Sequence, residues 1–582
     1  MRRRVTAFLA TLGLAAGGVL AGCGIPDHTD VKIEGQGPVG GPGAETNTNP
    51  MPKERDDATS AAEFVKNFLE AAAGESGERL LKTYMAPSLR DSVSLKSGIA
   101  VVEVRNTEFA ADNTVTLTVR HIGVLNANGE LLPPSEPGTT TYPMKIDEIE
   151  GNDGFFVTKA PPVPLMSVDA LSDFYTDRTV YFWNATRTAL VPDLRWLSVE
   201  VPSSRAPTEL LRMIESGPSP WLDGVASPLP DGSKLLANAP LDGDLLSMNW
   251  SPSAVDNNYQ DYLAQQVAWT MSEYPRPSRL QLKINGQIRE TYDVEPLRAR
   301  LPYPVGADVH AYVVVDGRVR AVKSSSPSIV IPLAGAADQN VRWAAFGRRG
   351  EELFGAVVSG TTLRVGSAVG GPVTSLRPVA AIVPTSPPVW LPESRLALVT
   401  TERGLYTVGL DGEARRLTPR EITGAITSVA AAPDGQRIAL VADGNVYVVP
   451  VSVSQDGTLA LASPRPLAAP LDKITAVGWS GETLLTVGGN GPNNRFAIVD
   501  VTIDGALRFE RTLDARGPVS MIAAYPENSA LQRSSMVMYE AENATWWPRE
   551  TDPRLERSDV VDDPAGTPGP DAPLPTAPFF VY

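Results

Sequence analysis

The chain has 582 residues, of which 42% are hydrophobic, so it can form several cores, and its length predicts three to four domains at about 150 residues each. Its formal net charge of −16 argues against nucleic-acid binding, which needs a basic face, and against direct adhesion to anionic lipid headgroups. The single cysteine leaves no partner for an internal disulfide, so each domain must be held together by packing alone.

The N-terminus has the layout of a secretory signal. Three arginines, Arg2 to Arg4, precede the uncharged and largely apolar stretch from Val5 to Leu20. A basic segment followed by a short apolar segment is typical of a signal peptide, and this stretch is shorter than the roughly 20 residues that a membrane-spanning helix needs. We therefore predict a signal peptide over residues 1–22.

The segment Leu20-Ala21-Gly22-Cys23 resembles the bacterial lipobox. That resemblance implies that the Cys23 thiol receives a diacylglyceryl group, and that cleavage frees its amine for a further acyl chain such as palmitate. Two or more acyl chains anchor a protein stably, at about 0.8 kcal/mol per buried CH₂ group. Cys23 is thus the predicted lipid-attachment residue. The alternatives are a plain signal peptide with an incidental cysteine, or an uncleaved anchor.

Residues 23–58 are predicted to form a flexible stalk. From Gly24 to Pro52 the sequence is rich in Gly, Pro, Asn and Thr and has scarcely an apolar cluster. Such a segment buries too little apolar surface to offset the entropy lost on ordering. It would hold the rest of the chain away from the membrane.

A small α+β domain is predicted over residues 59–190. Ser60 and Glu63 form a capping box at the start of an apolar pattern with helical spacing, and a second short helix covers about Glu78 to Tyr84. Alternating strands then follow, and an aromatic segment ends the domain. The predicted strands and the aromatic residues are Ala100–Val104, Thr114–Ile122, Tyr142–Ile149, Gly154–Thr158, and Phe174, Tyr175, Val180, Tyr181 and Phe182.

Residues 191–300 show a second α+β pattern. A strand from Arg195 to Val201 precedes a helix that opens at Pro207 and closes at Gly217-Pro218. A strand at Leu246–Trp250, a helix at Asp261–Met271 and a strand at Leu280–Ile284 follow, and the last ends in the turn pair Asn285-Gly286. This order, together with Pro228-Leu229-Pro230-Asp231-Gly232, resembles the GerMN (sporulation and germination) domain.

Residues 301–582 read as an all-β domain with an internal repeat. Short apolar strands alternate with Gly and Asp turns at a recurrence of about 40 to 50 residues, which is the length of one four-stranded propeller blade. Pro433-Asp434-Gly435 is the clearest turn between the first two strands of a unit. We predict a β-propeller of five or six blades, closed by a strand from Pro575 to Tyr582. A pair of β-sandwiches is the rival.

The order of an acylated Cys23, a stalk, a small α+β domain, a GerMN-like domain and a propeller is similar to that of the actinobacterial LpqB lipoproteins across essentially the whole chain. This resemblance implies a lipid-anchored protein on the extracytoplasmic face of the cell membrane. It also implies an accessory role to the MtrAB two-component system, through the extracellular part of a sensor histidine kinase like MtrB. That system is linked to cell-wall homeostasis and division. Only Cys23 is carried over as a functional residue.

The sequence offers little catalytic chemistry. Its three histidines, His28, His121 and His310, fall in the stalk and in two different predicted domains, so nothing brings them together at a metal. The motifs of zinc proteases, serine-nucleophile elbows and phosphate loops are missing from the sequence. The acidic pairs Asp56/Asp57 and Asp562/Asp563 fit solvated loops. We predict no catalytic residue, no metal site and no cofactor.

Two other features have the composition of ligand sites. The loop Asn490–Asn494 could bind an ion, although a long hairpin loop is the commoner reason for such a sequence. Five tryptophans could stack on sugars, although aromatic side chains more often lie in cores. These are Trp221, Trp250, Trp269, Trp390 and Trp479.

Three functions remain open from the sequence. The first is a non-enzymatic binding module that tunes a membrane sensor kinase. The second is a binder of cell-wall glycan or a wall precursor, through a cleft between the α+β and GerMN domains or through the propeller channel. The third is a propeller hydrolase, which would need a deep pocket with paired carboxylates.

Overall fold

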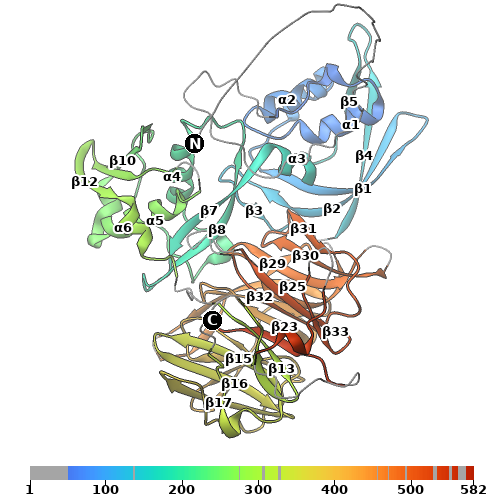
Figure 1. Cartoon of the computed structure of the whole chain (residues 1–582). Coiled ribbons are helices and arrows are strands. Elements are labelled where there is room, and N and C mark those ends of the chain that lie inside the picture. The colour runs from blue at the N-terminus through green and yellow to red at the C-terminus, as the bar shows by residue number, and fades with distance from the viewer. Residues whose placement is uncertain are drawn as a thin grey trace, which may run out of the picture. The chain divides into compact units, whose positions relative to one another are not determined.

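The computed structural model describes residues 50–134, 138–273, 276–303, 309–324, 330–454, 456–469, 471–491, 494–527, 534–548, 553–561 and 572–582. The predicted signal peptide, Cys23 and the stalk up to residue 49 lie outside these ranges. Within them, no helix is both long enough and apolar enough to span a membrane. Figure 1 gives the labels of the elements.

The first domain packs two helices on a mixed sheet. The helices are α1 (Ala61–Glu70) and α2 (Gly77–Tyr84), and both match the prediction. Ser60 caps α1 by accepting a hydrogen bond from the Glu63 amide at 3.2 Å, and the Glu63 carboxylate accepts one from the Thr59 amide. The sheet has the order β5-β4-β2-β1-β6, with β3 beside β2. Its strands are β1 (Ile99–Phe109), β2 (Thr114–Leu125), β3 (Leu131–Leu132), β4 (Thr139–Glu148), β5 (Phe155–Lys159) and β6 (Leu165–Ser167).

The strands β7 (Tyr175–Trp183) and β8 (Leu190–Ser198) form a two-stranded hairpin after the short helix α3 (Val168–Phe174). The sequence assigned this aromatic segment to the first domain, up to residue 190. In the structure Phe174 packs in the first core, but the end of β7 from Val180 onward packs in the second core. The division between the two cores therefore lies within β7 and not at residue 190.

The strand β8 begins at Leu190, five residues before the predicted start at Arg195. The prediction began too late because Pro192 and Asp193 are residues that disfavour a strand. Proline is tolerated where one strand edge is free. β8 pairs only with β7, so Pro192 fits there.

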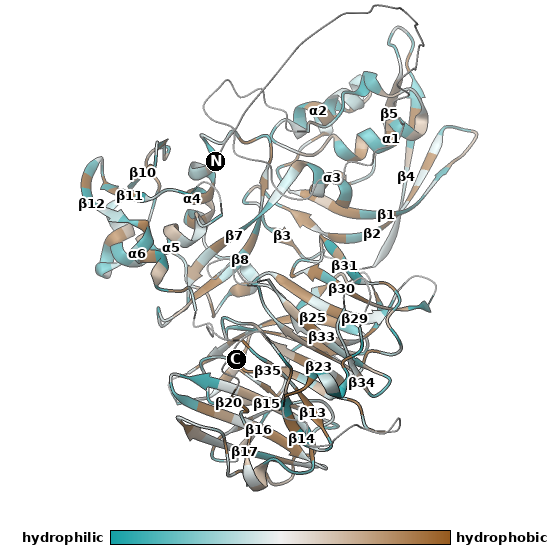
Figure 2. Cartoon of the chain, in the orientation of Figure 1, coloured by the Kyte–Doolittle hydropathy of each residue, from teal (hydrophilic) through white to brown (hydrophobic). Residues whose placement is uncertain are grey.

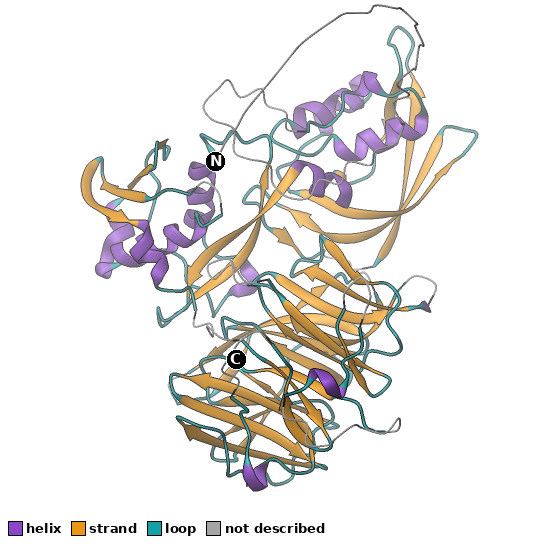
Figure 3. Cartoon of the chain, viewed as in Figure 1, coloured by secondary structure: helices purple, strands orange, loops and turns teal. Residues whose placement is uncertain are grey.

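The second domain contains a four-stranded sheet and three α-helices (Figure 3), and the sequence predicts the two longer helices and the two central strands. The helix α4 (Ala206–Ser216) ends at Gly217, whose φ of +86° lies in the region that glycine adopts freely. The strands β10 and β11 run parallel, and α5 contributes Leu263 and Val267 to the core. The remaining elements are β9 (Leu241–Asp242), β10 (Leu245–Trp250), α5 (Gln260–Thr270), β11 (Arg279–Ile284), β12 (Gln287–Asp293) and α6 (Val294–Ala299).

The C-terminal region forms six antiparallel sheets, which we call blades 1 to 6. Figure 2 shows the strands of this region as largely hydrophobic bands. The blades consist of β35-β13-β14, β15–β18, β19–β22, β23–β27, β28–β31 and β32–β34. Their bounds are β13 (Ala311–Val315), β14 (Arg318–Ala321), β15 (Val341–Arg349), β16 (Glu352–Ser359), β17 (Thr362–Val369), β18 (Arg377–Pro378), β19 (Val389–Trp390), β20 (Leu396–Thr401), β21 (Gly404–Gly409), β22 (Ala414–Leu417), β23 (Ile426–Ala431), β24 (Arg437–Ala442), β25 (Asn445–Val453), β26 (Leu459–Leu461), β27 (Arg465–Leu467), β28 (Asp472–Trp479), β29 (Leu484–Asn490), β30 (Phe496–Thr502), β31 (Arg508–Thr512), β32 (Met521–Tyr525), β33 (Met536–Ala541), β34 (Ala544–Trp546) and β35 (Thr576–Phe580).

The first strands of the blades close into a ring. Contacts join β15 to β19, β19 to β23, β23 to β28, β28 to β32, β32 to β35, and β35 back to β15. The ring is completed by the C-terminal strand β35, which pairs antiparallel with β13 in blade 1, as the segment Pro575 to Tyr582 predicts. Six small sheets in a closed ring are a propeller, and they are not the two facing sheets of the rival β-sandwich.

Candidate functional site

The hairpin β7–β8 contacts all three domains and joins them to one another. Every residue of β8 from Leu190 to Leu197 is buried. Tyr175 of β7 accepts a hydrogen bond at its hydroxyl from the Gly74 amide of the first domain. Leu194 of β8 packs in a propeller core, while Val191 packs in the second domain. A strand this buried can join three domains stably only if its polar groups have hydrogen-bond partners.

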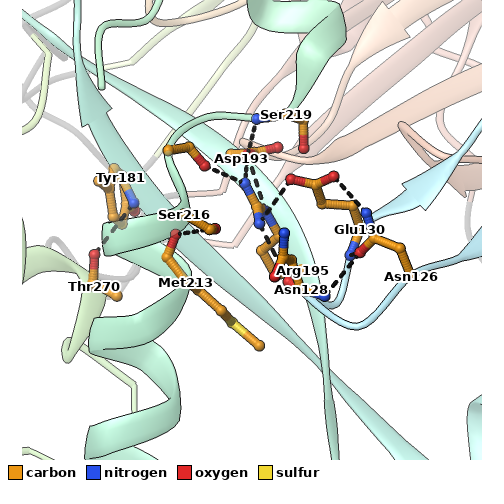
Figure 4. A network of polar contacts seen from close by, with 11 residues as sticks. Asn126, Asn128, Glu130, Tyr181, Asp193, Arg195, Met213, Ser216, Ser219 and Thr270 are labelled. Carbon is orange, nitrogen blue, oxygen red and sulfur yellow. Dashed lines mark hydrogen bonds and ion pairs between the residues drawn. The ribbon is translucent and has the colours of Figure 1, made fainter. Parts of the chain in front are cut away.

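Arg195 lies at the centre of the polar contacts of β8, and it is fully buried (Figure 4). Its guanidinium pairs with Asp193 at 2.8 Å and with Glu130 at 3.0 Å. It also donates to the Gly217 carbonyl at 2.7 Å and to the Asn128 carbonyl at 3.2 Å. One side chain thus connects β8, the end of α4 and the β2–β3 turn of the first domain.

The partners of Arg195 are held in place by their own contacts. The Asn126 side chain accepts from the amides of Asn128 and Glu130 and donates to the Glu130 carboxylate at 2.7 Å. The Ser219 amide donates to Asp193 at 2.9 Å. A buried charge network of this kind is costly to break, because losing one member leaves the others unpaired in a low-dielectric interior.

The first two domains are joined to blades 4 and 5 by two further buried contacts. The Trp196 indole donates to the Asp504 carboxylate at 2.8 Å, and Asp504 is oriented by Thr502 and the Ala506 amide. Arg465 donates to the Leu131 carbonyl at 2.5 Å, and burial lowers the pKa of Arg465. These contacts join the propeller to the hairpin and to the first domain.

Glu482, in the turn between β28 and β29, forms a third contact with the propeller. Its carboxylate accepts hydrogen bonds of 2.5 Å from the hydroxyls of Tyr181 and Tyr303. Burial raises the pKa of Glu482, and burial beside this carboxylate raises the pKa of both tyrosines. Nearby, fully buried Arg437 donates through Nε to Asp434 at 2.7 Å and lies over the Trp479 ring.

The propeller channel is small and apolar. Its lining, contributed by the first strands of the blades, leaves a cavity of about 80 Å³. Apart from Tyr582, the lining residues are Ala, Val, Ile, Met, Pro, Gly, Phe or Trp. Among these residues there is no carboxylate, so this channel does not supply the paired acids that the hydrolase hypothesis needs.

Three cavities lie between the domains. One of about 420 Å³ lies between the first domain and blade 5 and is lined by Glu103, Arg120, Asp169 and Arg508, among others. A cleft of about 420 Å³ separates the first and second domains and is lined by Asn126, Asn128, Tyr175 and Trp196, among others. The third cavity, of about 590 Å³, which we call the rim groove, lies between the β7–β8 turn and the turns of blades 2, 3 and 4. The rim groove is lined by Asn184–Thr186, Thr188, Gly224, Val225, Arg349, Pro392–Leu396, Gly435, Gln436, Ser452–Ser454 and Gly457.

The candidate histidines are not brought together. His28 lies outside the described residues. His121, on β2, is 3.0 Å from the Tyr142 hydroxyl, whereas His310 lies beside the start of β13 in the propeller. In the described ranges, no group of three His, Cys, Asp or Glu side chains is placed to hold a metal ion.

The other candidate residues have structural roles where they are described. Asp57 caps its own turn by accepting from the Glu54 amide. Asn490 donates to Asn494 within its hairpin, at 2.8 Å. Four of the five tryptophans are core residues, as expected: Trp250, Trp269, Trp390 and Trp479. Asp562 and Asp563 lie outside the described residues.

Sequence reasoning missed the Arg195 network and the Glu482 contacts. Asp193 and Arg195 are two residues apart, so they lie on the same face of a strand, and both stand in an otherwise apolar run. Opposite charges in that pattern indicate a buried pair and could have been recognised. For Glu482, whose partner Tyr181 is 301 positions away, the sequence carries no comparable signal.

Comparison with known families divides the chain in the same way. The family described as the lipoprotein LpqB beta-propeller domain matches residues 317–555, and the family described as sporulation and spore germination matches residues 179–290. The second match begins inside β7, where the structure places the start of the second core.

Whole-chain relatives carry one name. The lipoprotein LpqB of Nocardia farcinica is 25% identical over 537 residues, covering 83% of this chain and 86% of the relative. That of Mycolicibacterium smegmatis is 23% identical and covers 90% of this chain and 93% of the relative. Among solved structures, TolB from Acinetobacter baumannii aligns with 60% of this chain and 99% of its own at 10% identity, with a TM-score of 0.33. With a GerMN-type domain, an LpqB-type propeller and relatives of this name along most of its length, the chain is similar to the LpqB lipoproteins from the second domain to the propeller and beyond.

Proposed function

We propose that this protein is anchored by lipid on Cys23 to the extracytoplasmic face of the cell membrane, where it binds and modulates a sensor histidine kinase like MtrB. Such a kinase would control cell-wall homeostasis and division. Similarity to the LpqB lipoproteins carries this proposal. In it the chain acts as a non-catalytic binding module.

Two features of the fold support a binding role. The apolar channel leaves only about 80 Å³, which is too little for a substrate, since ligand pockets are typically about 300–1,000 Å³. The buried contacts of Arg195, Trp196 and Glu482 hold three domains in one arrangement. A preorganised surface loses less entropy on binding, and a membrane tether raises the effective concentration of a membrane partner.

The test compares the full-length protein with Cys23→Ala, each expressed in cells and each added to vesicles that contain the kinase. We expect C23A to be found in the soluble fraction and to alter kinase autophosphorylation much less than the unaltered protein at equal concentration. Equal regulation by both forms would show that tethering is not part of the mechanism. No effect of the unaltered protein on the kinase would overturn the proposed function.

A cell-wall glycan or precursor is the second candidate ligand, and the cleft of about 420 Å³ between the first two domains favours it. Tyr175 supplies aromatic surface there, and Asn126 and Asn128 supply amide groups, which is a combination that suits sugars. Saturable binding of purified wall polymer without the kinase, weakened by Asn128→Ala, would favour this candidate. Binding that N128A leaves unchanged would count against the cleft.

A further inference from the structure

We propose that the rim groove binds an extended polypeptide segment of the partner protein, one that carries an acidic and a basic side chain. This inference rests on the proposed function and adds the surface and the chemistry of the contact. The groove, of about 590 Å³, is in the range that accommodates specific ligands.

One wall of the groove is rigid. The Asn184 side chain accepts from the Thr188 amide at 2.9 Å and donates to the Thr188 hydroxyl at 3.0 Å, which fixes the β7–β8 turn. In the same turn, the Arg187 guanidinium lies 5.0 Å from the Tyr259 ring centroid and 5.2 Å from that of Tyr262. These contacts hold the wall in place before any ligand arrives.

The opposite wall presents charges of both signs. Arg349 and Glu393 lie close enough for Arg349 to act on the pKa of Glu393, which burial raises overall. Apart from this mutual attraction, neither side chain forms an ion pair or a hydrogen bond with another described residue. A guanidinium donates to a carboxylate in a planar fork, and a carboxylate accepts from an ammonium, so this pair suits a ligand that bears both groups.

Glu393 also holds a strained backbone conformation. Its φ of +58° lies in the left-handed region, which costs a non-glycine residue about 1 kcal/mol or more. The corresponding turn of the next blade places Gly435 in that region, with φ of +66°. The strained residue of blade 3 is thus an acidic residue that lines the groove.

The remaining lining favours a peptide over a sugar. The side chains of Gln436 and Ser452 make no hydrogen bond to other described residues, so donors and acceptors are both available for a peptide backbone. The lining contains no aromatic ring on which a sugar could stack. Mixed donors, acceptors and opposite charges match an extended chain segment best.

The experiment measures binding of the purified extracellular domain of the kinase to the full-length lipoprotein in phospholipid vesicles. Arg349→Glu and Glu393→Lys reverse the groove charges, and Gln436→Trp fills the groove. Arg403→Glu and Glu402→Lys are matched controls at the other end of β20, about 20 Å away. Both control residues are exposed, as are Arg349 and Glu393, so all four charge reversals should leave the fold intact.

We expect the three groove variants to weaken binding about tenfold or more, and the two controls to leave it within about twofold. Equal binding by the groove variants and the unaltered protein would overturn the groove while the proposed function stands. Absence of binding by the unaltered protein would overturn both. If soluble wall glycan binds instead, and the groove variants abolish that binding, then the groove is a sugar site and the polypeptide assignment is wrong.

Discussion

The indole N–H of Trp196 is bonded at 2.8 Å to the carboxylate of Asp504, a residue 308 positions further along the chain. Both groups are buried, so this contact joins the hairpin β7–β8 to the propeller in an environment from which water is largely excluded. An unsatisfied buried acceptor costs about 1–3 kcal/mol. The contact therefore couples the stability of the propeller to that of the two domains that precede it.

Replacing Trp196 by Phe tests this coupling. W196F keeps an aromatic ring but removes the donor to Asp504, so we expect the free energy of unfolding to fall by about 1–3 kcal/mol. Denaturant unfolding and protease cleavage between the domains are the measurements. Trp343→Phe is the control, because Trp343 is only partly buried and its indole makes no hydrogen bond with another described residue. Equal stability of W196F and W343F would contradict the assignment.

Arg195→Met should be more damaging. It removes the cation between Asp193 and Glu130 and leaves two buried carboxylates unpaired, which we expect to cost about 3–5 kcal/mol. Thermal unfolding measures the loss. Arg212→Met is the matched control, since Arg212 forms an exposed pair with Glu209 that is worth at most about 1 kcal/mol. A similar small loss in both variants would show that the network adds no stability.

Glu482 gives the interface a pH dependence of known sign. Its carboxyl has a pKa above the ordinary value of 4.5 in the folded protein, so the folded state binds a proton more readily than the unfolded state. The stability of the unaltered protein relative to Glu482→Gln should therefore be highest in acid and fall as the pH rises from about 4.5 toward neutrality. Unfolding curves of both proteins across this range measure the difference. A difference that stays constant or grows with pH would rule out the raised pKa.

The closing strand is tested at Phe579. This ring stacks on Tyr312 at 5.3 Å and on Phe346 at 5.7 Å, so it connects blades 1 and 2. Phe579→Ala should cost about 3–5 kcal/mol and increase aggregation, as measured by soluble yield and unfolding midpoint. Phe509→Ala is the matched control, because Phe509 is 51% exposed. A Phe579→Ala protein as stable as the control would mean that β35 does not secure the ring.

The sequence was sufficient wherever the deciding contacts are local. The helix α1 could be placed because Ser60 and Glu63 are three residues apart, and the propeller repeat could be recognised because each blade is built from adjacent strands. The end of the first domain could not be predicted. Val180 and Phe182 pack in the second core, and the residues that they pack with lie far along the chain.

The exact number of blades could not be predicted from the sequence repeat alone. Blade 1 is assembled from both ends of the domain, so its strands never appear as one unit in sequence. The rim groove could not be foreseen either. Its walls come from a turn of the second domain and from three separate blades, and only folding brings them together.

The pairing of β35 with β13 also constrains how the protein is made. Thr576 and Val314 are 262 positions apart, so nearly the whole propeller must be synthesised before its first blade can be completed. Until then β13 has an unpaired edge, and such edges are prone to pair with other chains. The propeller is therefore prone to aggregate until β35 is in place, and chaperone demand should be highest in that interval.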